Sequence, residues 1–364
     1  MIKVKDIASA MEQWAPLAWQ ESYDNAGLLV GDKNQEVSGI LVSLDCTEEV
    51  IEEAKAKNCN MIIAHHPIIF KGLKSLTGKN YVEKTVISAI KNDIILYASH
   101  TNLDHAPKGV SYHLAQKFGI KGQVLSPVKE NLKKLSFFVP RENAESVRMA
   151  LNSAGAGQIG NYDNCSFTSE GIGRFTPNQE ANPHIGKALK AEEVEEMKVE
   201  VILPSHKEAE ILQTLFTAHP YEEVSYFIQK LDNTWNEVGA GYIGELEKEI
   251  SEADFLQMIK QKLGIQNFRH SPKTGKKIKK IAFCGGAGSF LIQKAKAAGA
   301  DAYITGDIKY HEFFDAENQI ILVDVGHYES EVMIKDAICE YLSNIFCNFA
   351  VLKSETNTNP INFA

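Results

Sequence analysis

The sequence predicts an α/β protein with a mainly parallel sheet structure covered by helices, and an inserted ferredoxin-like α+β domain. Three observations lead to this prediction. Strands alternate with helices near both ends of the chain, the two end regions share one pattern, and the segment between them follows another. The 364 residues are also too many for one ordinary hydrophobic core, so two or three domains are expected.

The first copy of the shared pattern runs from residue 39 to residue 67 and reads strand, helix, strand. GILVSLD is apolar, TEEVIEEAKAK has helical character with Thr47 as its N-cap, and NMIIAHHP is a short buried strand. Before it, MIKVKDIASAMEQW reads as an amphipathic helix. After it, a further apolar strand, IILYASH, begins at Ile94.

The second copy runs from Ile278 to Ile308, where IKKIAF, SFLIQKAKAAGA and DAYITGD repeat strand, helix and strand. VIEEAKAKNCNMIIAHHP and LIQKAKAAGADAYITGDI keep the same apolar positions without a gap, and IILVDVGH follows from Ile320. We therefore predict an internal duplication with mainly parallel strands covered on both faces. In such sheets ligands bind beyond the carboxyl ends of the strands.

The segment from Ser126 to Asp232 has a different pattern. LKKLSFFVP and MKVEVILP are alternating strands that end at proline, and each is followed by a helix and a further β-like stretch. A β-α-β unit used twice is typical of a ferredoxin-like domain, whose close ends allow insertion into a loop. We predict a discontinuous core, residues 1–125 and 233–364, around an insert at 126–232. One continuous large domain is the alternative.

Composition excludes several classes of protein. Hydrophobic residues make up 44% and charged residues 23%, and no apolar run approaches the roughly 20 residues of a membrane span. The N-terminus lacks the apolar centre of a signal peptide. A net charge of −9 argues against a dedicated nucleic-acid binder. The 6 cysteines are scattered without a CxxC pair, which favours reduced thiols in the cytoplasm.

Side chains with metal-binding chemistry follow strands of both copies. His65 and His66 come directly after NMIIA, and successive side chains diverge at a strand end, so the pair can serve two adjacent ions. Asp104 lies in the turn-rich segment after ILYA. His327 and Glu331 are four residues apart at the start of a helix, on one helical face. Each motif alone is better explained by a turn pair, a cap or a solvated pair than by metal binding.

Together these residues offer three nitrogen and two carboxylate ligands at one edge of the predicted sheets. Zinc, manganese, iron and cobalt accept that mixture, and zinc is the metal we predict. Five protein ligands suffice for two ions per chain only if a carboxylate bridges them and water completes each shell. Glu331 is the predicted bridge. Open positions filled by water are typical of a catalytic site.

Two more residues are candidates for roles beside the metal ions. His100 ends its strand as His327 ends the matching strand, and an imidazole titrates near neutrality, so His100 is the candidate for proton transfer. Hydrogen-bond support of a ligand is its alternative role. Asp307 falls where His66 falls in the first copy, so it should face the site and orient a ligand.

Three other motifs are interpreted as structural. Gly155, Gly157 and Gly160 spell GxGxxG but follow a helix, whereas a dinucleotide fingerprint follows a strand. HPYEE, from His219, leads from helix to strand inside the insert. CGGAGSF, from Cys284, is interpreted as a close-packed turn, with a substrate-phosphate contact as the alternative. No base can be placed beside Cys284, so we do not predict a nucleophile there.

Several motifs, taken together, are similar to those of a known family along nearly the whole chain: YDNAGLLVGD (Tyr23 to Asp32), VSLDCTEEVIEEA, IIAHHPIIF, SHTNLD, CGGAGSF, ITGDIKYHE and GHYESE. The sequence resembles the NGG-interacting-factor-like proteins, also called the GTP cyclohydrolase I type 2 family. The resemblance implies a dinuclear site at the centre of a toroidal homohexamer, with the same five ligands. It also implies that residues 126–232 correspond to the insert of longer bacterial members, which resembles PII or CutA proteins.

Two functions fit these features. The first is a metal-dependent hydrolase of a nucleotide-like or cyclic amide or amidine substrate, of the GTP cyclohydrolase type by resemblance. No residue in the sequence selects GTP. The second is a non-enzymatic metal-binding or regulatory partner-binding protein, gated by the inserted domain. Neither a membrane nor a nucleic acid is an expected partner.

Overall fold

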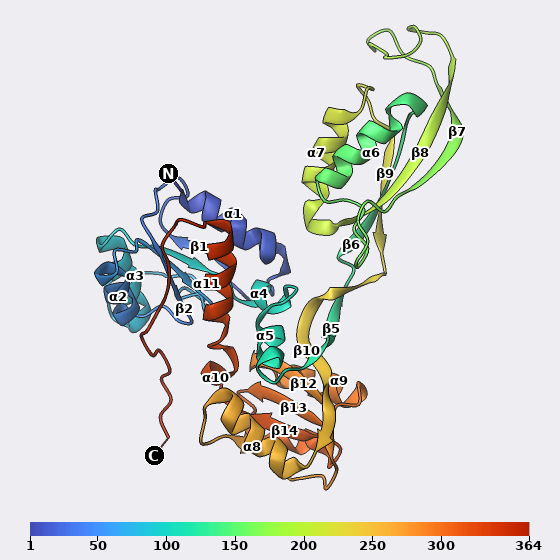
Figure 1. Ribbon diagram of the computed structural model, residues 1–364. Helices are drawn as coiled ribbons and strands as arrows, with labels where there is room; N and C mark the ends of the chain where they lie inside the picture. Colours follow the sequence, from blue (N-terminus) through green and yellow to red (C-terminus); the bar gives the residue numbers. More distant parts are fainter. Residues whose placement is uncertain (364) are drawn as a thin grey trace. The chain divides into compact units, whose positions relative to one another are not determined.

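The computed structural model describes residues 1–363 and divides the chain into two compact units (Figure 1). The core unit is Met1–Ser126 with Glu237–Ala364, and the insert unit is Pro127–Asn236. The predicted insert, 126–232, thus starts one residue before the insert unit and ends four residues before its end. Among the described residues, no helix combines the length and the apolar character needed to cross a membrane.

The first sheet of the core unit contains the first copy of the repeated pattern. Its strand order is β1-β4-β3-β2-β15. The strands are β1 (Gly27–Val30), β4 (Ile95–Ala98), β3 (Met61–Ala64), β2 (Ile40–Ser43) and β15 (Val351–Lys353). β15, β2, β3 and β4 run parallel, and β1 pairs antiparallel with β4. Every residue of β2, β3 and β4 is buried, as expected for parallel strands covered on both faces.

Helices cover this sheet on two sides. The helices are α1 (Val4–Trp14), α2 (Glu48–Ala56), α3 (Tyr81–Lys91) and α11 (Ile334–Ile345). Ile40 and Val42 pack in one apolar cluster with α1 and α11, whereas Leu41, between them, packs in another with α2 and α3. Thr47 caps α2 as predicted, because its side chain accepts a hydrogen bond from the Val50 backbone N–H.

The second sheet of the core unit has the order β11-β14-β13-β12-β10-β5. The strands are β11 (Arg269–His270), β14 (Ile321–Asp324), β13 (Ala302–Gly306), β12 (Ile278–Ala287), β10 (Thr234–Ile250) and β5 (Lys121–Lys129). β12, β13 and β14 are parallel, whereas β10 and β11 pair antiparallel. The prediction of mainly parallel strands therefore holds for the first sheet and only for the centre of the second, because the edge strands come from outside the repeated pattern.

The remaining helices of the core unit are short or pack on the second sheet. They are η1 (Leu17–Trp19), α4 (Thr101–His105), α5 (Val110–Lys117), α8 (Glu252–Leu263), η4 (Ser289–Leu291), α9 (Ile292–Ala297), η5 (Tyr310–Ala316) and α10 (His327–Glu331). The order β4-β3-β2 in the first sheet matches β14-β13-β12 in the second. The two copies therefore share one arrangement, and their strands end in comparable places.

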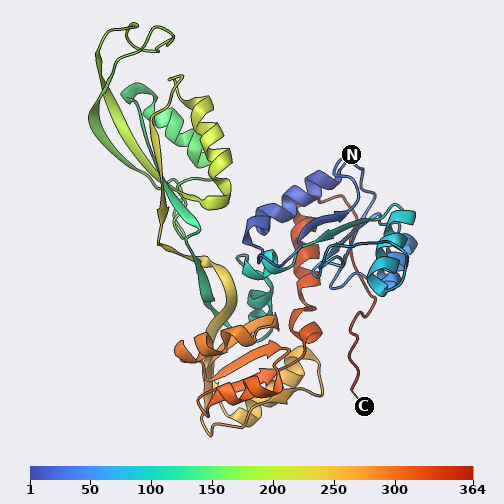
Figure 2. The same cartoon turned by 180° about the vertical axis from the view of Figure 1, so that it is seen from behind.

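The insert unit follows the order β6, α6, β7, β8, α7, β9 along the chain. Its elements are β6 (Leu132–Pro140), η2 (Arg141–Asn143), α6 (Ala144–Ser153), β7 (Phe167–Phe175), β8 (Glu192–Pro204), η3 (Ser205–Lys207), α7 (Glu208–Ala218) and β9 (Tyr226–Leu231). The sheet order is β7-β8-β6-β9 with antiparallel pairs, the topology of a ferredoxin-like domain. Both helices pack on one face of this sheet (Figure 2).

The structure places the three glycines of the GxGxxG motif in the loop after α6, as the sequence predicts. Gly155, Gly157 and Gly160 have φ angles of 98°, 78° and 55°. Positive φ is costly for residues with a Cβ atom, so glycine is the residue suited to this turn. His219 also has a structural role, because its Nε2 bonds to the Phe138 carbonyl and its Nδ1 accepts from the Tyr221 N–H.

Deletion of Pro127–Asn236 should leave a folded core unit. β5 and β10 are neighbours in the second sheet, and Gly122 lies against the backbone of Ile243, so a short linker should be able to join Ser126 to Glu237. We expect a monodisperse product with a cooperative thermal transition, measured by size-exclusion chromatography and circular dichroism. Insoluble product with every linker from two to six residues would show that the insert unit is needed for folding.

Candidate metal centre

The five predicted ligand residues come together at the strand ends of the core unit. His65 and His66 follow β3, whereas His327 and Glu331 are the first and last residues of α10, which follows β14. Asp104 lies in α4, not in a turn as the sequence suggested. This helix spans only Thr101–His105, too short to show a periodic apolar pattern.

One group of ligand atoms forms a small triangle. The Nε2 atoms of His66 and His327 are 3.2 Å apart, and they lie 3.0 Å and 3.1 Å from Glu331 Oε2. Ligand atoms around a tetrahedral zinc ion, with bonds of about 2.0–2.1 Å, lie roughly 3.3 Å apart. The triangle therefore has the size that one such ion requires.

A second group uses the other oxygen of Glu331. His65 Nε2 lies 3.8 Å from Glu331 Oε1 and 3.7 Å from Asp104 Oδ1. His65 Nε2 and Asp104 Oδ1 are buried and have no hydrogen-bond partner among the described residues. Such unpaired buried atoms are uncommon in proteins, and an ion that both atoms coordinate would explain them. The histidine and carboxylate clusters could therefore hold metal ions.

Each imidazole is fixed through its second ring nitrogen. His65 Nδ1 bonds to the Ser99 carbonyl at 2.8 Å. His66 Nδ1 bonds to Asp45 Oδ1, and His327 Nδ1 bonds to Asp307 Oδ2, both at 2.7 Å. These contacts leave the Nε2 atoms to face the cluster, the arrangement that orients histidine ligands in metal sites. Asp307 therefore contacts His327 of α10, at the place where the sequence predicts an orienting residue.

His100 lies against the same cluster. Its ring centre is 5.3 Å from that of His65 and 5.4 Å from that of His66, and these three residues form a further group able to hold an ion. His100 Nδ1 bonds at 2.8 Å to Asp24, whose side chain is fully buried. Burial raises the pKa of Asp24, but hydrogen bonds from His100 and Thr101 outweigh burial and hold the pKa well below its usual range. His100 thus donates its Nδ1–H to a carboxylate that stays ionised.

The carboxylates and imidazoles of the cluster strongly shift one another's pKa. Burial alone lowers the pKa of His66, but contacts with Asp45 and Glu331 outweigh it and raise the pKa to about 10. Contacts with Glu331 and Asp307 similarly raise the pKa of His327 to about 9. Burial raises the pKa of Asp104, and the charge of Glu331 raises it further. Without a metal ion, the site therefore holds protons on imidazoles that metal binding must displace.

The glycine-rich CGGAGSF motif packs against this site. The backbone N–H groups of Gly285, Gly286 and Gly288 donate to the hydroxyls of Ser111, Ser330 and Thr305. A Cβ atom on Gly286 would lie only 2.3 Å from Glu331 Oε1, so glycine leaves room for that carboxylate. These three amides are occupied, which favours the close-packed turn over a phosphate contact at this motif.

Cys284, the first residue of that motif, is buried. Burial and the charge of Asp104 raise the pKa of its thiol to about 12. A thiol with this pKa stays protonated at neutral pH and is a poor nucleophile. This agrees with the inert role that the sequence suggested for Cys284.

A pocket of about 570 Å³ opens over the cluster. Its wall includes Tyr23, Phe70 and Phe290, whose exposed fractions are 62%, 43% and 65%. Residues 359–361 of the C-terminal segment also line it. None of the described lining residues is lysine or arginine.

The family model named Duf34/NIF3 (NGG1p interacting factor 3) matches residues 2–360. The chain belongs to this family. It is 38% identical over 367 residues to a Bacillus subtilis protein named GTP cyclohydrolase 1 type 2 homolog, covering 99% of this chain and 98% of the relative. It is 37% identical to a Staphylococcus aureus protein of the same name, with both chains fully covered.

Solved structures of NIF3-related proteins have the same fold. A Bacillus cereus protein related to NIF3 matches with a TM-score of 0.88 and 39% identity, covering 100% of this chain and 99% of that protein. Staphylococcus aureus protein SA1388 matches with a TM-score of 0.79 and 33% identity, again covering 100% and 99%. The mixed α/β fold of this chain is therefore that of the family.

Sequence reasoning did not identify several residues of this NIF3-family site. Asp24 and Asp45 bind the imidazoles of His100 and His66, and the C-terminal Thr358 donates to Asp45 at 2.5 Å. Asp45 was detectable in principle, because it ends the segment GILVSLD at the same edge of the sheet as His65. Thr358 carries no such signal, since the tail follows the last helix without a motif.

Replacing the carboxylates that orient the imidazoles should weaken metal binding. We expect Asp45→Asn and Asp307→Asn each to lower metal affinity by about 10–100-fold, because the imidazoles lose the acceptor that fixes them. Competition with a chromophoric chelator measures the change. Asp315→Asn, at an exposed aspartate outside the pocket, is the matched control and should bind as the parent does. Unchanged affinity in both site variants would contradict the orienting role.

Proposed function

We propose that this NIF3-family protein is a dinuclear metal-dependent hydrolase of a nucleotide-like or cyclic amide or amidine substrate. One observation carries the proposal: Glu331, 2% exposed, directs one carboxylate oxygen to each of two ligand clusters. Two divalent ions there, zinc by preference, would lower the pKa of water and polarise the group under attack. The proposed ligands are His65, His66, Asp104, His327 and Glu331.

His100 is the residue we propose for proton transfer, with Asp24 as its positioning residue. The Asp24 carboxylate accepts from Nδ1, so the other ring nitrogen of neutral His100 has a free lone pair. A buried carboxylate that fixes the tautomer of a catalytic imidazole plays the same part in hydrolytic triads. His100 can therefore take a proton from the attacking water and deliver it to the leaving nitrogen.

The pocket lining favours recognition of a flat ring over recognition of phosphate groups. Tyr23, Phe70 and Phe290 present exposed aromatic surface, which stacks well on planar heterocycles. Without lysine or arginine among the described lining residues, a triphosphate would lack the partners that usually bind it. We therefore propose that the ring of the substrate supplies its specificity, although the curated relatives are named homologues of a GTP cyclohydrolase.

Three further features belong to the proposal. The family resemblance supports a toroidal homohexamer, which light scattering would detect as six chains per particle. The β-α-β-β-α-β topology of the insert unit supports a PII- or CutA-like domain. The free cysteines, of which Cys46, Cys59 and Cys284 are buried, support a reducing compartment and hence a cytoplasmic location.

Metal content is the first test. Protein purified without chelator should carry close to two divalent ions per chain by mass spectrometry of the elements, as the two clusters imply. Glu331→Ala should lose more metal than His65→Ala or His66→Ala, because only Glu331 belongs to both clusters. Wild-type protein without transition metal, or Glu331→Ala with full metal content, would refute the site.

Substitution of His100 tests the hydrolase. On a substrate found by screening metal-loaded protein against nucleosides, nucleotides and cyclic amides, His100→Asn should keep its metal and lose about 10²–10⁴-fold in rate. Asparagine keeps a hydrogen-bond donor, so a purely orienting role would survive the change. Loss of metal along with activity would instead make His100 a ligand.

The same screen separates the hydrolase from its alternative. A metal-loaded protein that binds small molecules without converting any of them would favour the non-enzymatic metal-binding or partner-binding function.

A further inference from the structure

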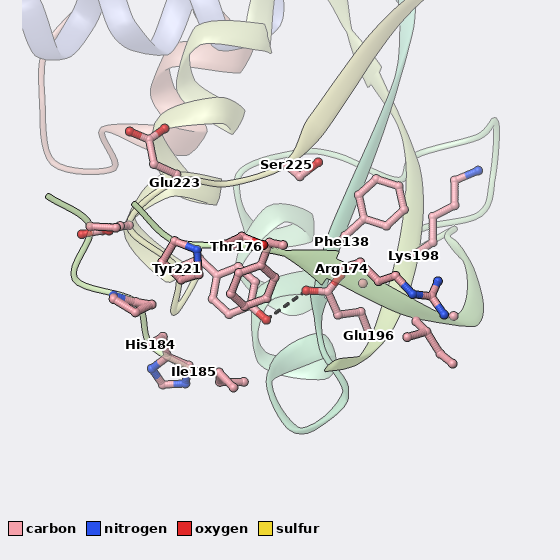
Figure 3. A pocket seen from close by; sticks show the side chains of 18 of the residues that line it. Phe138, Arg174, Thr176, His184, Ile185, Glu196, Lys198, Tyr221, Glu223 and Ser225 are labelled. Atoms are coloured by element: carbon pink, nitrogen blue, oxygen red, sulfur yellow. Dashed lines mark hydrogen bonds between the residues drawn. The ribbon is translucent and has the colours of Figure 1, made fainter. Parts of the chain in front are cut away.

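The insert unit contains a cavity of about 740 Å³ that the proposed hydrolase does not use (Figure 3). The residues of β6 and β8 that line it, Phe138, Glu196 and Lys198, alternate with residues such as Phe137 and Val199 that pack beneath the helices. The cavity therefore lies on the sheet face opposite α6 and α7. The loop after β7 and the segment before β9 complete its wall.

A buried carboxylate faces this cavity. Glu196 is 9% exposed, and the Tyr221 hydroxyl donates to its Oε1 at 2.9 Å (Figure 3). Gly173 of β7 makes room for the other oxygen, because a Cβ atom there would lie 2.1 Å from Oε2. Glu196 thus has one neutral donor for one oxygen, while its second oxygen has no hydrogen-bond partner among residues 1–363.

The cationic side chains around the cavity are paired with other acids. Lys198 Nζ lies 3.0 Å from Glu200, and Arg174 Nε lies 2.8 Å from Glu193. No lysine, arginine or histidine among the described residues forms an ion pair with Glu196. Glu196 therefore presents to the cavity a carboxylate that no cation of the described residues occupies, and a cation from outside the unit can pair with it.

Aromatic rings surround the same space. The ring centre of Tyr221 lies 6.2 Å from that of Phe175 and 6.1 Å from that of His184, and all three residues line the cavity with Phe138. Tyr221 is held in place because its backbone N–H donates to His219. Aromatic faces attract organic cations, and cages of such rings are a recurrent way of binding ammonium groups.

We propose that this cavity is a binding site for a small organic ammonium ion, with Glu196 as its counter-ion and Phe138, Phe175 and Tyr221 as its aromatic wall. The volume suits a small molecule, since ligand pockets are commonly about 300–1,000 Å³. An inorganic cation would use the carboxylate but not the rings, whereas an uncharged ligand would leave Glu196 unpaired. An ammonium ion satisfies both features at once.

The test is calorimetric titration of the full-length protein with choline and with 3,3-dimethyl-1-butanol, its uncharged isostere. Choline should bind at least about tenfold more tightly than the isostere, because only the cation interacts with Glu196 and the ring faces. This comparison needs no variant, so it does not depend on how a substitution affects folding.

Two variants locate the site. Glu196→Gln should weaken choline binding by about tenfold or more, while keeping an acceptor for Tyr221. Glu195→Gln is the matched control, since Glu195 is exposed, does not line the cavity and carries the same charge. It should bind choline within about twofold of wild type.

Three outcomes would overturn the proposal. Equal binding of choline and its isostere would remove the role of charge, and equal loss in both variants would remove the role of Glu196. The third outcome concerns another possible occupant of the cavity, a lysine side chain from a second copy of the chain, which also carries an ammonium group. If Glu196→Gln changes the oligomeric mass in light scattering, the cavity holds that side chain and not a free ion.

Discussion

The buried carboxylate of Glu331 is the contact on which the core site depends. It is nearly inaccessible to water, yet His65, His66 and His327 all approach it. A buried anion is stable only when positive charge surrounds it. His66 and His327, whose pKa values are raised, supply that charge as protons in the absence of metal, and divalent ions would supply it otherwise. Metal affinity must therefore rise with pH as these protons are lost.

Two glycines of the second copy leave room for Glu331 and for the helix that carries it. A Cβ atom on Gly286 would collide with Glu331, and one on Gly306 would lie 2.8 Å from the His327 backbone nitrogen. At the position of Gly306 the first copy has His65, and at the position of Asp307 it has His66. The first copy thus supplies two of the proposed ligands at its strand end, whereas the second provides space and an acceptor for α10, which carries His327 and Glu331.

The strand ends and the five clustered residues could be predicted because they are local features. A few neighbouring residues of sequence are enough to recognise a buried strand followed by two histidines. The same holds for a histidine and a glutamate four residues apart after a strand. The supporting contacts could not be predicted this way. Asp24 lies 76 residues from His100, and Thr358 lies 313 residues from Asp45. Such pairs depend on how distant loops fold together. Asp104 was misplaced because a five-residue helix carries no periodic signal.

Each unit contains a buried glutamate, Glu331 in the core unit and Glu196 in the insert unit, and the side chains around the two carboxylates differ. Glu331 contacts His66 and His327 and raises their pKa values, so the chain itself offers cations that metal can replace. Glu196 has only the Tyr221 hydroxyl, which is neutral, and the cost of burial and the charge of Glu196 raise the pKa of that hydroxyl further. Tyr221 therefore stays protonated and neutral near neutral pH, and it supplies no positive charge to balance the carboxylate. The histidine neighbours of Glu331 are suited to binding a metal ion, whereas the aromatic rings around Glu196 are suited to binding an organic cation.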